Sequence, residues 1–427
     1  MNTNKLELMS PAGSSEALMA AIKAGADSVY FGLDSLNMRN AKGSNFTMDD
    51  LPEISGICRS NNIKSYLTLN TVIYDNDIDL VRKILDASLE NKISAVIATD
   101  HAVMNYAKKI GQNIHISTQC NISNIEAVEF YSAYANVMVM ARELTLTQVA
   151  EIAKQIEERN ITGPNGELVR LEVFGHGALC MSISGKCYLS LDNYGNSASA
   201  NRGSCAQNCR RNYIVIDKIS GIELEIENEY IMSAKDLCTI NFLDKIKAAG
   251  VSVLKIEGRG RSADYVYTVT KCYREAIDSL YSGDYSPGKF EDWLARLSTV
   301  FNRGFWDGYY LGKKLGEWSD VYSSKATKKK IYVGKGVNYF PQAKVAEFVI
   351  EDIEVINGDD ILIIGPTTGV IEVKLKDIRA NGEISDKAIK GDLLTFKLDE
   401  KMRESDKLYK LVDSKEEEFG GIIPLIV

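Results

Sequence analysis

Short apolar segments alternate with amphipathic helical patterns through the first three quarters of the sequence. Eight of these segments are predicted as strands, at residues 6–9, 28–31, 64–69, 95–99, 113–117, 136–140, 169–174 and 252–256. Helical periodicity covers 77–90, 102–109, 125–134, 146–158, 237–249 and 263–282, and an earlier Ala-rich helix ends at Gly25. Such alternation predicts a parallel sheet with helices packed outside it. Eight strand–helix units predict a (β/α)8 barrel, with a doubly wound open sheet as the alternative.

The character of the sequence changes after residue 330. Between 331 and 427, about six short strand-like runs are separated by turns that contain Gly and Asp, which predicts a small β-barrel. The run VINGDD before ILIIG resembles the second-domain barrel of elongation factors and other translational GTPases, a similarity of fold alone. A chain of 427 residues is too long for one small core. We therefore expect two domains, at 1–325 and 331–427, joined by a basic linker at 325–330.

Composition argues against several classes of protein. A net charge of −8 disfavours a generally basic nucleic-acid binder, but a local basic groove is compatible with it. The sequence contains no window of 18 apolar residues, so no membrane span is expected. Its first residues lack the apolar core of a signal peptide, which predicts a cytoplasmic protein. In that compartment, clustered cysteines are more typical of metal binding or chemistry than of disulfides.

Five of the eight cysteines lie in or near the long gap between the seventh and eighth predicted strands. These five are Cys180, Cys187, Cys205, Cys209 and Cys238. In a barrel, an insertion at about 175–240 leaves the carboxyl end of strand seven and lies on the catalytic face. The insertion also contains a hairpin-like pair of runs at 213–217 and 223–227. The other three are expected to be ordinary, two within helical patterns and one beside a strand end: Cys58, Cys272 and Cys120.

The spacing of the clustered cysteines is compatible with three states. Structural zinc sites prefer two close pairs of ligands, and only Cys205 and Cys209 are spaced that closely. An iron–sulfur cluster tolerates irregular spacing, because four thiolates bind the corners of a bulky group. Unligated thiols are the third possibility. Spacing alone leaves all three open.

Polar residues follow several of the predicted strands, where a barrel places its active site. They include Asn70, Gln119, Asn121, Arg142, Glu143, His176, Glu257 and Arg259. Helix caps and loops are polar in any protein, so the joint occurrence of these residues is better evidence than any one of them. The motifs H-E-x-x-H and G-x-S-x-G do not occur in the sequence. A peptidase would therefore have to use another arrangement, such as Cys180 with His176 as its base.

Several motifs resemble the collagenase-like peptidase family, the U thirty-two group. They are ELMSPAGSSEALMAAIKAGADSVYFG, ISTQCNISN, ARELTL, EVFGHGALCMSISGKCYLS, NRGSCAQNCR, MSAKDLC and KIEGRGRS. The resemblance covers essentially the whole chain. It implies oxygen-independent hydroxylation of tRNA wobble uridine, ribosomal RNA cytidine or ubiquinone precursors, with an iron–sulfur cluster and a dependence on prephenate. The length and the added β-barrel match the tRNA branch best, whose product is 5-hydroxyuridine.

The resemblance also implies roles for individual residues. The implied ligands of a 4Fe-4S cluster are Cys180, Cys187, Cys205 and Cys238, with Cys209 as an alternative ligand and zinc as the alternative metal. Catalytic roles are assigned to His176, Glu143 and Glu257. Substrate-binding roles are assigned to Arg39, Gln119, Asn121, Arg142, Arg202, Arg210, Arg211, Lys235 and Arg259. Arginine and lysine suit a dicarboxylate such as prephenate, and an ion pair at the barrel mouth is an equal reading for Glu143 and Arg259.

Two other functions remain open at this point. The family name suggests a peptidase that acts on collagen-like or other peptides. A non-enzymatic alternative is an RNA-binding or maturation partner that needs a paralogous subunit for activity. The expected partners are accordingly tRNA and, in the non-enzymatic alternative, a paralogous subunit, with no membrane.

Overall fold

The computed structural model describes residues 5–39, 46–223, 232–312, 316–321 and 324–414. The side chains of 193, 194, 196 and 197 also lie outside this description. The chain divides into two compact units. One consists of Met1–Lys325 with Ile364–Val370, and the other of Ala326–Ile363 with Ile371–Val427.

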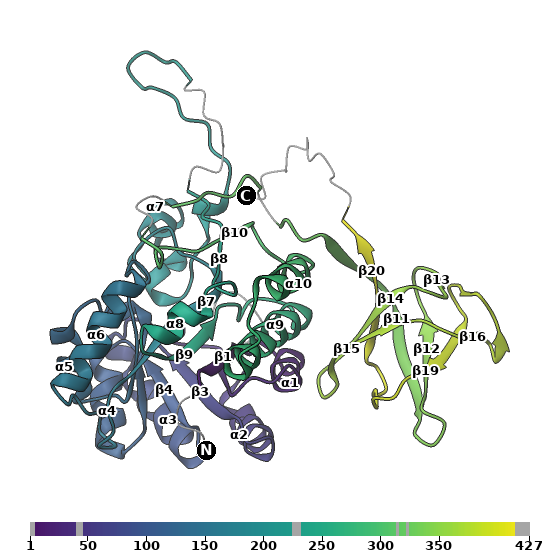
Figure 1. Cartoon of the computed structure of the whole chain (residues 1–427), viewed down its shortest axis with the longest axis horizontal. Helices are drawn as coiled ribbons and strands as arrows, with labels where there is room; N and C mark the ends of the chain where they lie inside the picture. Colours follow the sequence, from purple (N-terminus) through teal and green to yellow (C-terminus); the bar gives the residue numbers. More distant parts are fainter. Residues whose placement is uncertain (1–4, 40–45, 224–231, 313–315, 322–323, 415–427) are drawn as a thin grey trace. The chain divides into compact units, whose positions relative to one another are not determined.

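Eight parallel strands close into a barrel in the first unit (Figure 1). They are β1 (Glu7–Pro11), β2 (Ser28–Gly32), β3 (Lys64–Leu69), β4 (Ala95–Ala98), β5 (Ile114–Ile116), β6 (Val137–Val139), β7 (Arg170–Ala178) and β9 (Val251–Ile256). Strands β1 to β7 pair in sequence order, and β9 pairs in parallel with both β7 and β1. This double pairing of β9 joins the two ends of the sheet. The predicted (β/α)8 barrel is therefore confirmed, and the open-sheet alternative is wrong.

Helices connect the barrel strands and cover the outside of the sheet (Figure 1). They are α1 (Ser15–Lys23), α2 (Leu51–Ser60), α3 (Ile78–Glu90), α4 (His101–Ile110), α5 (Ile125–Ser132), α6 (Leu146–Glu158), α8 (Leu243–Ala248), α9 (Ala263–Ser282) and α10 (Pro287–Ser298). Their sequences carry the expected signals: the Ser14 side chain caps α1 by accepting from the Ala17 amide, and Gly111 ends α4 in the left-handed conformation. Helix α3 buries Val81, Ile84 and Leu85, one face of its helical period. Helix α2 was not among the predicted ranges, although Cys58, which lies in it, was assigned to a helical pattern.

The cysteine-rich insertion follows β7, as predicted, but it returns to the sheet in an unexpected way. Within it, α7 (Leu189–Tyr194) is followed by short 3-10 turns, and then β8 (Asp236–Cys238) pairs antiparallel with the end of β7. Strand β10 (Phe305–Trp306) pairs with β8 in turn. The helix predicted at 237–249 is thus wrong in its first part and is limited to α8, because β8 is stabilised by pairing with a strand distant in sequence. An isolated antiparallel bridge joins Ile216 to Glu223, and the rest of the predicted run 223–227 lies outside the described residues.

The second unit is an antiparallel β structure, as predicted for this part of the sequence. Its main sheet has the order β15-β14-β20-β11-β12-β19-β16-β17, and β13 pairs with β18 in a smaller sheet. The strands are β11 (Lys328–Phe340), β12 (Val345–Ile350), β13 (Val355–Ile356), β14 (Asp360–Gly365), β15 (Gly369–Lys374), β16 (Arg379–Ala380), β17 (Glu383–Ile384), β18 (Lys387–Ala388), β19 (Leu393–Lys397) and β20 (Lys407–Asp413). Phe348 and Phe396 stack in its core with ring centroids 5.7 Å apart. The predicted linker 325–330 is wrong at its end, because β11 begins at Lys328 and pairs there with β20.

No helix among the described residues is both long enough and apolar enough to cross a membrane.

Candidate active site at the carboxyl ends of the barrel strands

Glu257 lies just beyond β9, at the carboxyl end of the barrel. Its Oε1 forms a 2.7 Å ion pair with Nη2 of Arg39, and its Oε2 accepts a 3.3 Å hydrogen bond from the hydroxyl of Tyr30. Burial alone would raise the pKa of Glu257, but Arg39, Arg142 and Arg259 lower it to about 2. The group is therefore a carboxylate at neutral pH. The predicted position of Glu257 at the carboxyl end of the barrel is confirmed.

Arg259 is buried beside Glu257 and hydrogen-bonds only neutral partners among the described residues. Its Nη1 donates to Thr68 Oγ1 at 3.0 Å and its Nη2 to Asn37 Oδ1 at 2.9 Å. A Cβ atom on Gly32 would lie 2.0 Å from this Nη1, so only glycine leaves room for the guanidinium. Burial lowers the pKa of Arg259 to about 10, and the group stays positively charged.

Arg142 follows β6 and places its guanidinium over the ring of Phe174, 4.0 Å from the centroid. Its Nη1 donates to the carbonyl of Ala178 at 3.4 Å, while its buried Nε has no hydrogen-bond partner in the described part of the chain. The neighbouring Glu143 is exposed to solvent. Arg142 is thus poised to bind an acceptor that the chain itself does not supply.

Two further arginines, which sequence reasoning did not select, share the ring of Phe301. The guanidinium of Arg261 lies 3.4 Å from the ring centroid and that of Arg303 lies 4.9 Å from it. Arg303 forms a 3.4 Å ion pair with the buried Asp236, whose pKa is raised by burial despite three nearby arginines. The guanidinium of Arg261 makes no hydrogen bond or ion pair within the described residues. Burial lowers its pKa, because nothing at direct bonding distance compensates for its desolvation.

Electrostatic interactions connect all these groups into one network, which we call the arginine network. Its members in the described residues are six arginines, Arg39, Arg142, Arg210, Arg259, Arg261 and Arg303, and two carboxylates, Glu257 and Asp236. Four positive charges are therefore in excess, within a chain whose net charge is −8. Burying unpaired charges is unfavourable unless something compensates for them. This end of the barrel is suited to anionic ligands.

Four cysteine thiols of the insertion lie within electrostatic reach of one another and of this network. Burial raises the pKa of Cys209, and so do the thiols of Cys180, Cys205 and Cys187, while Arg210 lowers it. Cys238 is placed differently, in β8, where its buried Sγ accepts a hydrogen bond from the hydroxyl of Tyr273 at 3.7 Å. Burial raises the pKa of Cys238 to about 11. Cys209 is thus the thiol whose pKa responds to the other three, whereas Cys238 lies buried against Tyr273.

The cysteines of the insertion are the residues that would hold an iron–sulfur cluster or a zinc ion. Among the described residues, no three Cys, His, Asp or Glu side chains are arranged to hold one metal ion. A cluster spreads its thiolate ligands over the corners of a larger group, so it accepts a wider set. Four thiolates around a cluster also carry negative charge, which matches the excess of arginines. Cys180, Cys187, Cys205 and Cys209 would hold the group in this arrangement, and the ligand role of Cys238 stays a prediction.

His176, predicted to be catalytic, is enclosed in aromatic side chains. Its Nδ1 lies 3.4 Å from the hydroxyl of Tyr273, and the rings of Tyr265 and Phe305 also pack against it. Burial lowers the pKa of His176 to about 3, so the imidazole is neutral at physiological pH. Cys180, its suggested partner in a peptidase, is exposed while His176 is buried.

Several predicted substrate-binding residues are engaged by other parts of the chain. Arg202 forms a 2.7 Å ion pair with Asp77 and also binds the carbonyl of Val72, so it ties the insertion to the loop after β3. Buried Arg210 donates to the carbonyls of Leu179 and Ala234, next to Cys180. Among the other predicted substrate-binding residues, Lys235 forms a 3.0 Å ion pair with Glu317. The side chain of Gln119 is hydrogen-bonded to Asn70 and Thr99, and the side chain of Asn121 donates to the Gln119 carbonyl. Arg211 is exposed to solvent.

Comparison with known proteins adds a family. The model of peptidase family U32 matches residues 13–320, which is more than half of the chain. The chain belongs to peptidase family U32.

Three relatives of this U32 protein differ in what their names describe. A collagenase of Porphyromonas gingivalis is 57% identical over 417 residues, which cover 98% of this chain and 100% of the relative. A tRNA hydroxylation protein P of Helicobacter pylori is 35% identical over 319 residues, 72% of each chain. A tRNA hydroxylation protein P1 of Bacillus subtilis is 28% identical over 421 residues, 96% of this chain and 95% of the relative. These relatives identify the U32 protein as an enzyme, and two kinds of enzyme are represented.

Two of the three site residues that sequence reasoning missed lie inside motifs that it quoted, and the third, Arg303, lies in the run FNRGFWDGYYLG at 301–312. Arg261 is two residues beyond Arg259 in KIEGRGRS, and Asp236 lies within MSAKDLC. Arg303 belongs to a Gly- and aromatic-rich run that had no assigned role. The available signal was the density of arginines in three separate motifs of the U32 sequence, but only the fold shows that they meet.

Proposed function

We propose that this U32 protein hydroxylates the wobble uridine of tRNA to 5-hydroxyuridine without oxygen, with prephenate as co-substrate and an iron–sulfur cluster. The observation that carries the proposal is the arginine network, which lies beside the thiols of the insertion. Its positive charges would bind the carboxylates of prephenate and compensate the negative charge of a thiolate-ligated cluster at the same end of the barrel. The relatives named tRNA hydroxylation proteins support it, and the one from Bacillus subtilis aligns with 96% of this chain.

The arginines would bind the carboxylates of prephenate. Guanidinium groups bind carboxylates in a bidentate manner, and Arg142 and Arg261 both hold donors that no described residue uses. Each of these guanidinium groups rests on an aromatic ring, Phe174 or Phe301, which restricts its orientation. Arg39 has a different role, because its ion pair with Glu257 keeps that carboxylate charged.

The thiols would hold the cluster, which when bound supplies one-electron redox chemistry at this face. Arg210 orients the peptide groups of Leu179 and Ala234 and places a buried positive charge next to Cys209 and Cys180. In this proposal Arg210 is a positioning residue and not a substrate ligand. The positive field of the network would also attract the phosphates of tRNA, so binding should weaken steeply with salt.

The deciding experiment compares three cysteine variants of protein purified without oxygen. Cys209→Ser and Cys238→Ser each remove one candidate ligand, and Cys272→Ser is the matched control, a buried cysteine within α9. Iron and acid-labile sulfide are measured for each, and tRNA nucleosides are analysed in a host that lacks the gene and carries each variant. We expect Cys209→Ser to lose both the cluster and 5-hydroxyuridine, and Cys272→Ser to lose neither.

Other outcomes are informative in different ways. Loss of the cluster in Cys238→Ser but not in Cys209→Ser would assign the fourth ligand to β8 and contradict the grouping of the thiols. Wild-type protein that binds no iron, or a deletion host with unchanged tRNA nucleosides, would overturn the proposal. Activity that returns only when a paralogue is added would show that the chain acts as one subunit of an assembly.

A peptidase is the second candidate, because the relative from Porphyromonas gingivalis that is 57% identical is named a collagenase. His176 is a poor base for this chemistry, since its pKa is about 3 and its nearest polar partner is Tyr273. Gelatin cleavage by purified wild-type protein, abolished by His176→Gln and by Cys180→Ser, would establish the peptidase. Cleavage that persists in both variants would point to a contaminating protease.

A further inference from the structure

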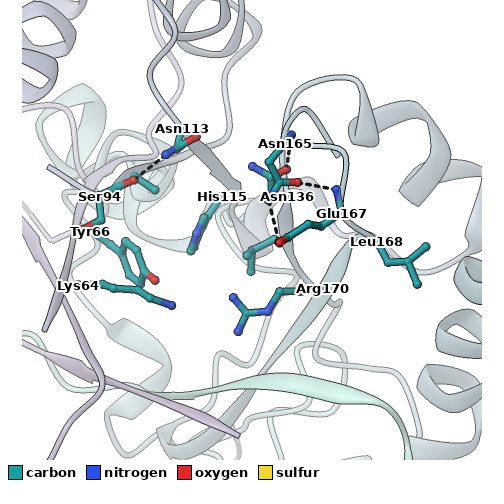
Figure 2. Close-up of a pocket in the computed structure, with 12 residues that line it drawn as sticks. Lys64, Tyr66, Ser94, Asn113, His115, Asn136, Asn165, Glu167, Leu168 and Arg170 are labelled. Carbon is teal, nitrogen blue, oxygen red and sulfur yellow. Dashed lines mark hydrogen bonds between the residues drawn. The ribbon is translucent and has the colours of Figure 1, made fainter. Parts of the chain in front are cut away.

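A cavity of about 430 Å³ lies at the other end of the barrel, where the parallel strands begin. Its lining includes the first or neighbouring residues of β3, β4, β5, β6 and β7. Figure 2 shows Lys64, Tyr66, His115 and Arg170 pointing toward a common space. Asn113, Asn136 and Asn165 lie along one side of it (Figure 2). The cavity is built by the barrel alone and shares no lining residue with the arginine network.

Two cations at this cavity share one carboxylate, and each has further hydrogen-bond donors without an acceptor among the described residues. Nζ of Lys64 and Nη2 of Arg170 both contact Oε2 of Glu7, at 2.7 and 3.1 Å. In the part of the chain that the structure describes, this is the only hydrogen bond of either cation. The Nε and Nη1 donors of Arg170 are therefore unused, and Nζ of Lys64 has two further hydrogens.

Two buried polar atoms behind these cations also lack hydrogen-bond partners among the described residues. They are Nδ1 of His115 and Oε2 of Glu172, which lie 3.9 Å apart. Glu172 is completely buried and His115 is 7% exposed, and His115 lines the cavity. Leaving such atoms unpaired in a protein interior is unfavourable, and of these two residues His115 is the one that lines the cavity.

The charges around the cavity leave room for an anion. Lys64, Arg170 and Lys255 are positive, and Glu7 and Glu172 are negative. Glu167, at the rim, is exposed and hydrogen-bonded to Asn165. Three positive and three negative charges therefore lie at or behind the cavity, and the groups that suit an anion are the unused donors of Arg170 and Lys64.

We propose that the amino-terminal mouth of the barrel is a second binding site, which takes a small oxyanion, either a carboxylate or a phosphate group. The Nε and Nη1 edge of Arg170 binds two oxygens of the anion, and Nζ of Lys64 binds it from the other side of the space. The side-chain amides of Asn113 and Asn136 provide neutral donors at the rim. The inference stands on the geometry of this cavity and is independent of the proposed tRNA hydroxylation.

The test uses full-length protein and isothermal titration calorimetry with two probes, inorganic phosphate and acetate, at low ionic strength. Arg170→Gln removes the bidentate donor, and Asn113→Asp adds a repulsive charge at an exposed position of the rim. Arg82→Gln is the matched control, because Arg82 is a partly exposed arginine with one ion pair on α3, to Asp79. We expect each cavity variant to bind the preferred probe at least about tenfold more weakly and the control to bind it as wild type does.

The two probes identify the source of the anion. Tighter binding of phosphate assigns the site to a phosphorylated ligand, and tighter binding of acetate assigns it to a carboxylate. No heat of binding with either probe, or equal binding by wild type and both cavity variants, would overturn the proposal. Asn113→Asp keeps the test decisive even if Arg170→Gln fails to fold, since its side chain is exposed and does not pair with Glu7.

Discussion

The two ends of the barrel treat buried charge in opposite ways. At the amino end, Lys64 and Arg170 share Glu7, and Lys255 forms a 3.0 Å ion pair with Glu172. At the carboxyl end, the six arginines of the arginine network meet only two carboxylates among the described residues. A nearly balanced set stabilises the fold by itself, whereas an unbalanced set is compensated only by what binds to it. The contrast separates a region built mainly for stability, with one open cavity, from a region built for ligands.

The largest expected effect comes from breaking a buried pair at the amino end. Lys255→Met leaves the carboxyl group of Glu172 without its partner in a fully buried position, and we expect it to lower the free energy of unfolding by about 3–5 kcal/mol. Urea denaturation measures this. The control is Lys154→Met on α6, whose exposed 3.5 Å pair with Glu158 contributes at most about 1 kcal/mol. Equal effects of the two variants would contradict the comparison.

A second prediction uses one buried histidine at each end. Burial lowers the pKa of His115 and of His176 to about 3, from an ordinary value of 6.5. The unfolded chain therefore takes up protons first as the pH falls below 6.5, and the free energy of unfolding decreases until the pH nears 3. Each histidine contributes a slope of about 1.4 kcal/mol per pH unit within this window.

Urea denaturation between pH 7 and pH 5 tests this slope. His115→Gln and His176→Gln should each remove about half of the histidine contribution, because both side chains are buried to a similar degree. Glu7 and Glu257, with pKa values of about 2, add a loss in the same direction only below pH 4.5. Glu172 and Asp236, whose pKa values are raised by burial, act in the opposite direction, so the comparison is between wild type and each histidine variant. Equal slopes of stability against pH in wild type and variant would show that the imidazole is not held neutral.

A smaller effect is expected where the insertion is attached to the barrel. Arg202→Ala removes the ion pair with Asp77 and the contact with the ring of Tyr74, 4.4 Å from its guanidinium, and should lower the free energy of unfolding by about 1 kcal/mol. Because the Arg202–Asp77 ion pair attaches the cysteine insertion to the barrel, we expect the variant to lose most of its bound iron while it remains folded. Iron content and urea denaturation of the same sample distinguish the two. An unchanged iron content would show that Arg202 does not position the insertion.

The smallest effect on stability is expected for a variant of the arginine network, and it tests most directly whether the two barrel ends differ. Arg261→Met removes a cation that has no direct partner in the described residues, so the free energy of unfolding should change by less than about 1 kcal/mol or even increase. Binding of prephenate should nevertheless weaken by more than about tenfold, which equilibrium dialysis measures. Arg303→Met is the partner experiment, because it leaves the buried Asp236 uncompensated and should destabilise the protein. Similar destabilisation by both variants would place Arg261 in the fold and not in a ligand site.

Much of the fold could be predicted because its signals are local. The eight barrel strands follow from short apolar runs, and α9 was predicted at its observed bounds, 263–282. Local signals failed where a partner distant in sequence decides the conformation. Strand β8 occupies residues that read as a helix, since it hydrogen-bonds to His176, Gly177 and Ala178 in β7. The candidate site divides in the same way: Glu257 was placed correctly by its position after a strand, whereas Arg261 was not selected.

The sequence by itself determined the kinds of chemistry available: an insertion rich in thiols, arginines in several motifs and eight strand–helix units. It did so because residue type and short-range periodicity need no knowledge of the rest of the chain. Only the tertiary structure decided that the barrel closes through β9, that Cys238 lies buried against Tyr273, and that Arg142 and Arg261 keep donors that no described residue uses. Charge compensation and burial are properties of neighbours in space, and these neighbours come from segments separated by many residues in the sequence.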